Sequence, residues 1–251
     1  TAIGPGLAAR IMTGAPMPAG ADAVVPVEQT DGGTARVQIT LAAPVGRHLR
    51  RVGEDVQAGD TVLAAGTFLG AAQIGLLAAV GKERVRVRPR PRVVVISTGR
   101  ELVEPGQPLD LGQITDSNSF LLTTAAREAG AVAYRVAPVP DDERALLGRI
   151  QDQLVRADMI VTSGGVSAGA YDVVKQVLST VGTVTFDKVA MQPGMPQGFG
   201  TVGEEATPIF TLPGNPVSAF VSFEAFVRPA IRKMLGVSRL HRPSVKAVLQ
   251  T

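Results

Sequence analysis

A loop of small residues is the strongest candidate for chemistry, because it joins a short apolar run to a predicted helix. Its hydroxyl and glycine residues include Ser163, Gly164, Gly165 and Ser167. Backbone N–H groups and hydroxyls at a helix start can bind phosphate without a lysine. Asp172 follows the loop, and a carboxylate beside bound phosphates is a usual ligand of Mg²⁺. The alternative is a glycine-lined turn in which Asp172 only interacts with the helix dipole, and both interpretations stay open.

Two further motifs also join a predicted strand to a turn. The first contains Thr98, Gly99 and Glu101, and a small hydroxyl–glycine turn lets a ligand approach the backbone closely. The second contains Pro213, Gly214, Asn215 and Ser218. Because Asn215 suits an N-cap and the next residue is a proline, the helix that follows is expected to offer N–H donors to an oxyanion.

A rigid Pro/Gly loop and an acidic helix start complete the candidates. The loop at 191–198 contains Pro193, Gly194 and Pro196, and such loops are often functional, although many only connect elements. Asp116 precedes a predicted helix; an N-cap is the simpler interpretation, and contact with a ligand or cation is the alternative. With no His-Glu-x-x-His helix and no Asp-x-Asp-x-Asp-Gly calcium loop, the sequence favours an enzyme that positions phosphates and a metal.

The elements that must position these motifs alternate from residue 93 onward. Strands are expected at 93–96, 131–139, 159–161, 184–189 and 209–210, and helices at 117–129, 141–156, 171–178 and 216–235. This alternation predicts an α/β fold with a parallel or mixed sheet and helices on both faces. Ligands bind such sheets at the carboxyl ends of the strands, where most of these motifs lie.

Residues before 93 have a different pattern. Short β-rich runs at 23–27 and 37–41 are bounded by Gly, Pro and Asp, and one helix is expected at 69–80. From Arg84 to Arg92, arginines alternate with valines and prolines, which predicts a solvated edge strand. An anion or nucleic-acid patch is the alternative, and a basic stripe without aromatic neighbours supports it only weakly.

The composition of the 251 residues excludes several classes of protein. The chain has no Cys and only two His, so thiolate zinc sites, disulfide frameworks and His-rich metal sites are excluded. Its net charge is only +3 and it has no Trp, so no nucleic-acid partner is expected. No apolar run approaches the roughly 18 residues of a membrane helix, and no membrane partner is expected. The start carries no signal segment, which predicts a cytoplasmic setting, and the chain is interpreted as a fragment of a longer protein.

Seven motifs occur in a fixed order along the chain: Arg10–Val25, Gly53–Val56, Ser97–Gly99, Asp116–Asn118, Ser163–Ser167, Pro193–Gly194 and Leu212–Ser218. In these motifs the chain resembles the MoeA family of molybdopterin molybdenumtransferases, which is related to the gephyrin E domain. The resemblance implies that molybdate is inserted into adenylylated molybdopterin with Mg²⁺ and that AMP is released. It also implies a homodimer that acts on these small molecules.

The resemblance further implies a division into domains. Residues 1–45 resemble the end of a small β domain, and residues 46–88 resemble part of an elongated dimerisation domain. Residues 89–237 resemble a MogA-like α/β domain, and residues 238–251 resemble the start of a truncated C-terminal β barrel. The fold is therefore expected to be an α/β domain preceded by small β-rich domains with one helix.

The same resemblance gives expected roles to individual residues. The loop from Ser163 to Ser167 is similar to the family's cradle for the pterin phosphate and the nucleotide. Asp172 and Asp116 match its active-site acids, with Asp172 as the preferred Mg²⁺ ligand, and Pro196 and Ser218 match positions near its molybdate pocket. Together with the other strand-end and loop residues named above, these are the candidate substrate-binding residues.

Some positions depart from the common pattern of the family. Gln192 and Met195 stand where many members carry lysines, and Arg100 replaces an acidic residue. A non-catalytic module of the gephyrin E type, which binds a pterin or nucleotide or serves as a scaffold, is the alternative function.

Overall fold

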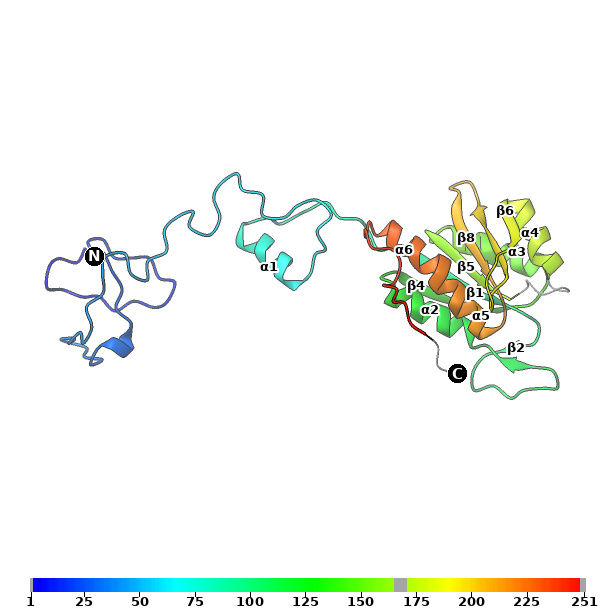
Figure 1. The fold of residues 1–251 in the computed structure, drawn as a ribbon, viewed down its shortest axis with the longest axis horizontal. Helices are drawn as coiled ribbons and strands as arrows, with labels where there is room; N and C mark the ends of the chain where they lie inside the picture. The colour runs from blue at the N-terminus through cyan, green and yellow to red at the C-terminus, as the bar shows by residue number, and fades with distance from the viewer. Residues whose placement is uncertain (1, 165–170, 249–251) are drawn as a thin grey trace. The chain divides into compact units, whose positions relative to one another are not determined.

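A computed structural model describes residues 2–164 and 171–248 of the chain. Its contacts divide the chain into two compact units, Thr1–Val80 and Gly81–Thr251, which we call the N-terminal unit and the α/β unit. Figure 1 shows the elements of both units, and each unit is described by itself.

The α/β unit is built on a six-stranded sheet in the order β4-β1-β5-β8-β7-β6 (Figure 1). Its strands are β1 (Arg92–Thr98), β4 (Val132–Val139), β5 (Met159–Ser163), β6 (Gly182–Lys188), β7 (Pro196–Val202) and β8 (Thr207–Leu212). The strands from β4 to β8 in this order run parallel, whereas β7 is antiparallel to both β8 and β6. A separate ladder pairs β2 (Leu102–Val103) with β3 (Ile114–Thr115). The predicted α/β class with a mixed sheet is confirmed.

Helices cover both faces of this sheet. One face carries α2 (Asn118–Glu128), α5 (Pro216–Ser222), the π-helical segment η2 (Phe223–Val227) and α6 (Arg228–Met234), and the other carries α3 (Glu143–Leu154) and α4 (Tyr171–Val181). The helix predicted at 216–235 is present, but η2 interrupts it just before Pro229, whose ring displaces the preceding turn. Among the helices of the described residues, none has the length and apolar character needed to cross a membrane.

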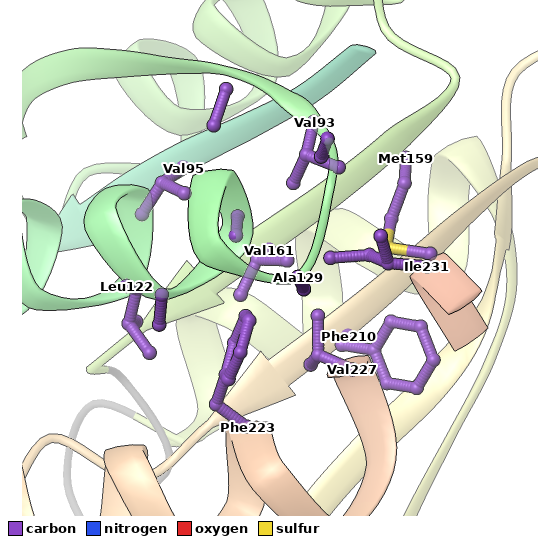
Figure 2. Packing of buried hydrophobic residues seen from close by; sticks show 14 of the residues in the cluster. Val93, Val95, Leu122, Ala129, Met159, Val161, Phe210, Phe223, Val227 and Ile231 are labelled. Atoms are coloured by element: carbon purple, nitrogen blue, oxygen red, sulfur yellow. The ribbon is translucent and has the colours of Figure 1, made fainter. Parts of the chain in front are cut away.

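Two buried layers hold the α/β unit together. On β1, the four residues Val93–Ile96 are fully buried, as expected for a strand with helices on both faces. Val93 and Val95 pack with Leu122 of α2 and Phe223 of η2 (Figure 2), whereas the alternate residues face α3 and α4. Burial of each such side chain stabilises the fold by roughly 1.5–3 kcal/mol. The ends of the central strands are therefore held in place by a well-packed core.

The sequence does not predict β7, because Gly198 and Gly200 lower its strand propensity. The structure shows why glycine occupies these positions. A Cβ atom on Gly198 would lie 2.7 Å from the Phe186 ring, and one on Gly200 would lie 2.0 Å from the Thr183 carbonyl oxygen. The close approach of β6 and β7 therefore requires residues without side chains.

The N-terminal unit differs from its prediction. The prediction of strands at 23–27 and 37–41 is wrong. These segments contain only the start of the 3₁₀ turn η1 (Val27–Gln29) and one end of an isolated bridge between Thr30 and Ile39. Two short segments without a third strand or a covering helix form a ribbon of marginal stability. The predicted helix is confirmed as α1 (Ala71–Ala79), yet no residue of the described range 2–80 is buried.

The edge strand expected from Arg84 to Arg92 is also wrong. Described residues 81–91 form no strand, and β1 begins only at Arg92. The prolines of this segment lack the N–H donors that a strand ladder needs. Its last two arginines instead bind residues at the amino end of the sheet. Arg90 donates from Nε to the Gly130 carbonyl oxygen at 2.8 Å, and Arg92 pairs with Asp158 at 2.8 Å.

Candidate functional site

The carboxyl ends of three neighbouring parallel strands bring the predicted motifs together. In the register of the sheet, Ser97 of β1 lies opposite Ser163 of β5, which in turn lies opposite Leu212 of β8. The loops after these strands therefore begin side by side. Gly164 adopts a φ of +96°, and a Cβ atom there would lie 2.3 Å from the Thr98 carbonyl oxygen. Only glycine fits this close approach of two backbones.

The loop after β8 joins the same cluster. A Cβ atom on Gly214 would lie 3.5 Å from the Cα atom of Gly164, so these two loops are in contact. Asn118, the first residue of α2, donates from Nδ2 to the Ser163 hydroxyl at 2.7 Å and to the Gly214 carbonyl oxygen at 2.7 Å. Sequence reasoning treated Asn118 only as part of a helix-start cluster and missed this bridging position.

Several N–H groups that the sequence assigns to an anion already have partners within the chain. Asn215 Oδ1 accepts from the backbone N–H groups of Val217 and Ser218 at 3.0 and 3.1 Å, so these two N–H groups at the start of α5 are not free to bind an oxyanion. The N–H groups of Gly99 and Gly164 donate to carbonyl oxygens of Val139 and Leu212. Among the described residues, the N–H groups of Gly214 and Asn215 have no acceptor, and these remain as donors.

Two carboxylates lie beside the end of β1. The carboxylate of Glu101 folds back over Gly99, where a Cβ atom would lie 2.7 Å from either of its oxygens. Asp141 follows the end of β4, and its Oδ1 is buried with no hydrogen-bond partner. Burial, and next the negative charge of Glu101, raise the pKa of Asp141 above its ordinary value, against a smaller effect of Arg100. Sequence reasoning missed Asp141, although its position directly after a parallel strand could have indicated it.

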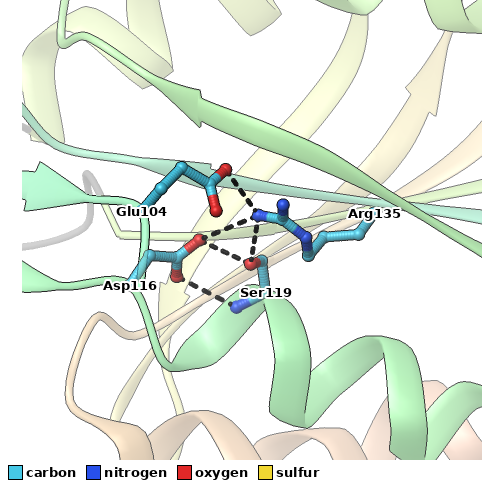
Figure 3. A network of polar contacts seen from close by, with 4 residues as sticks. All are labelled: Glu104, Asp116, Ser119 and Arg135. Atoms are coloured by element: carbon cyan, nitrogen blue, oxygen red, sulfur yellow. Dashed lines mark hydrogen bonds and ion pairs between the residues drawn. The ribbon is translucent and has the colours of Figure 1, made fainter. Parts of the chain in front are cut away.

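Asp116 lies in a buried polar network at the start of α2 (Figure 3). Its Oδ1 accepts from the Ser119 N–H at 3.1 Å, and its Oδ2 accepts from the Ser119 hydroxyl at 2.5 Å. Arg135 of β4 approaches Asp116 at 3.9 Å and pairs with Glu104 at 2.9 Å. Both carboxylate oxygens are thus engaged within the protein, which favours the capping interpretation, and a catalytic role of Asp116 stays a prediction.

The Pro/Gly loop before β7 is held by the side-chain amide of Gln197 and by a backbone hydrogen bond from the Val189 N–H to the Met195 carbonyl oxygen at 2.8 Å. The Gln192–Pro193 peptide bond is cis, and Gln197 Nε2 donates to the Gly194 carbonyl oxygen and to the Ser222 hydroxyl, each at 2.6 Å. Pro196 is the first residue of β7. The loop therefore has a fixed shape, but its Met195 offers no charge to an anion.

Some predicted site residues lie beyond what the structure describes. Gly165 and Ser167 are outside the described residues. Asp172 is the second residue of α4, and its side chain is likewise outside the description. The roles predicted for these three residues stay predictions.

An open α/β sheet with glycine-bearing loops at its parallel strand ends defines a protein of the doubly wound ligand-binding class. Comparison with protein families makes this more specific. A model described as "Probable molybdopterin binding domain" matches residues 94–233, and a model of the "MoeA N-terminal region (domain I and II)" matches residues 1–81. The chain belongs to the MoeA family.

Individual relatives agree with this assignment. The chain is 54% identical over 98% of its length to the molybdopterin molybdenumtransferase 2 of Mycobacterium tuberculosis, of which it covers 62%. It is 42% identical over 95% of its length to the molybdopterin molybdenumtransferase of a Nostoc species and covers 55% of that protein. A solved molybdopterin biosynthesis MoeA protein from Pyrococcus horikosii matches 88% of the chain with a TM-score of 0.69 and 34% identity, and 55% of it is covered. The chain thus spans less than two thirds of these relatives.

Proposed function

We propose that the chain is part of a transferase that inserts molybdate into adenylylated molybdopterin and releases AMP. The observation that carries this proposal is the meeting of the loops after β1, β5 and β8 at Thr98, Gly164 and Gly214. Tight, glycine-lined strand ends let a phosphorylated ligand approach the backbone. The names of the relatives support the same reaction.

The residues at the strand ends would act mainly by binding and orienting. The Thr98 hydroxyl is buried without a partner, and the N–H groups of Gly214 and Asn215 have no acceptor among the described residues. These groups would hold phosphoryl oxygens, while Ser218 and Pro196 would lie near the molybdate. Cleavage of the bond between the pterin phosphate and the adenylyl group would then depend on positioning and on stabilisation of charge.

The carboxylates beside the end of β1 fit a magnesium ion. Mg²⁺ takes one or two protein carboxylates and completes its shell with water and phosphate oxygens. Glu101 and Asp141 supply such oxygens, and the buried, unpartnered Oδ1 of Asp141 is a group that a cation would satisfy. These two residues would hold the ion, with Asp172 as a further predicted ligand. The bound ion would neutralise phosphate charge.

The N-terminal unit supports a proposed homodimer. The helix α1 consists almost entirely of apolar residues, yet it contains no buried residue, and Ile74 is 58% exposed. A short apolar helix is stable in water only when another surface covers it. We assign that surface to a second copy of the chain, and we retain the domain division and the cytoplasmic setting as further parts of the proposal.

The proposed function is tested by incubating the chain with adenylylated molybdopterin, molybdate and Mg²⁺ and measuring AMP by chromatography. We expect AMP release that depends on molybdate, together with its loss in Asp141→Asn. Matched Asp152→Asn changes an exposed acid of α3 and should leave the release unchanged. Binding of AMP without any release would instead support the non-catalytic module.

A further inference from the structure

Asn118 is the one side chain of the described residues that hydrogen-bonds to two of the strand-end loops at once. Its Nδ2 lies 2.7 Å from the Ser163 hydroxyl at the end of β5 and 2.7 Å from the carbonyl oxygen of Gly214 after β8. The Ser163 hydroxyl in turn lies 3.4 Å from the Pro213 carbonyl oxygen. A single amide from α2 therefore joins both loops.

The chemistry of the amide fixes its orientation. A carbonyl oxygen such as that of Gly214 only accepts, so the NH₂ group of Asn118 must face it. The other end of the amide, Oδ1, is then buried without a partner, which costs free energy. The pair of bonds made by Nδ2 compensates for this cost, and the side chain has one favourable arrangement.

The helix that carries Asn118 is itself held in place. Asp116 binds the N–H and hydroxyl groups of Ser119, and Arg135 links this pair to Glu104 (Figure 3). The guanidinium of Arg135 also lies 4.2 Å from the centre of the Phe120 ring. The first turn of α2 is thus anchored to β4 and to the segment after β2.

We propose that Asn118 is a positioning residue that sets the separation between the end of β5, at Ser163 and Gly164, and the loop after β8, and through them the affinity for the ligand. The inference rests on the proposed function, because it assigns Asn118 to the same strand-end site. Without the amide, the Ser163 hydroxyl and the Gly214 carbonyl oxygen lose their shared donor, and Gly164, which touches Gly214, loses its support.

The test compares Asn118→Ala with Ile150→Val, which removes one methylene from the core beneath α3 and has a similar modest cost in stability. Calorimetry with AMP measures affinity, and hydrogen exchange measures the protection of the Gly164 N–H, which donates to Leu212. We expect Asn118→Ala to weaken AMP binding about tenfold, the equivalent of about 1.4 kcal/mol, and to speed Gly164 exchange. Ile150→Val should change neither beyond its global effect.

A double variant shows whether Asn118 acts through Ser163. If it does, Asn118→Ala combined with Ser163→Ala weakens AMP binding by clearly less than the product of the two single effects. If the two single effects on the AMP dissociation constant simply multiply in the double variant, the inference is overturned. It is also overturned if Asn118→Ala binds AMP as tightly as Ile150→Val. If the unchanged chain binds no AMP, the proposed function fails, and unaltered Gly164 exchange in Asn118→Ala would then overturn the positioning role independently.

Discussion

Replacing Gly164 by alanine should disrupt the strand-end site at its tightest point. The residue has a φ of +96°, and the added Cβ would lie 2.3 Å from the Thr98 carbonyl oxygen and 3.1 Å from its hydroxyl oxygen. The left-handed backbone costs an L-residue about 1–2 kcal/mol, and relief of the overlap with a backbone atom costs about 1–3 kcal/mol more. We therefore expect Gly164→Ala to lower the free energy of unfolding by about 3 kcal/mol and to weaken AMP binding.

The matched control is Gly148→Ala in the middle of α3. A Cβ atom there meets no atom within 4 Å, and alanine is the better helix former by about 0.5–1 kcal/mol. Urea unfolding should therefore shift in opposite directions for the two variants, while calorimetry with AMP should show a loss only for Gly164→Ala. If Gly164→Ala were as stable as the unchanged chain and bound AMP equally well, the close contact between the β1 and β5 loops would be refuted.

Three further substitutions test the polar groups around the site. Because the folded-state pKa of Asp141 is raised above its ordinary value of 3.8, ionisation above that pH disfavours the folded state. Asp141→Asn should therefore be more stable than the unchanged chain at pH 7, by about 1 kcal/mol, and should lose less stability between pH 4 and pH 7. If the melting temperatures of the two proteins changed equally with pH over this range, the buried environment of the Asp141 carboxylate would be contradicted. Arg135→Met removes the cation beside buried Asp116 and should cost about 2 kcal/mol in urea unfolding, with recovery in the double variant Arg135→Met/Asp116→Asn; equal losses in both would remove Asp116 from the network. Asn215→Ala removes the cap of α5 and should cost about 1 kcal/mol by thermal unfolding, whereas an unchanged midpoint would show that the cap is not needed.

The central strands could be predicted because burial on both faces removes polar residues from them. Residues 93–96 and 159–161 are continuous apolar runs, and each lies in a parallel strand of the sheet. Once these strands are parallel neighbours, the motifs that follow them must meet at one edge. The position of Thr98, Ser163 and Gly164 therefore follows from the sequence.

Strands that depend on partners could not be predicted in the same way. β7 contains Gly198 and Gly200, whose function is to allow close contact with β6, and the local pattern does not show that contact. Conversely, the β-rich segment at 37–41 has the expected residue types but lies exposed and forms only one bridge. Strand propensity describes how a residue fits a half-buried surface, so it fails where that surface is absent.

Two adjacent acids show a second limit of sequence reasoning. Asp142 is the N-cap of α3, and its Oδ1 accepts from the Ala145 N–H at 2.9 Å. Asp141, one residue earlier, instead faces the charge of Glu101 with a buried oxygen. The cap spacing explains Asp142, whereas the environment of Asp141 depends on its position after β4 and beside Glu101.

The same competition between capping and binding decides which helix start can serve a ligand. A good N-cap and a bound oxyanion accept hydrogen bonds from the same first N–H groups of a helix. Asn215 predicts the start of α5 and, for that reason, occupies its donors. The residues that precede α4 in the sequence are Gly169 and Ala170, and neither has a side chain that can accept a hydrogen bond. Neither of these two residues can therefore compete as a side-chain cap with a phosphate at the start of α4, and phosphate recognition there stays a prediction.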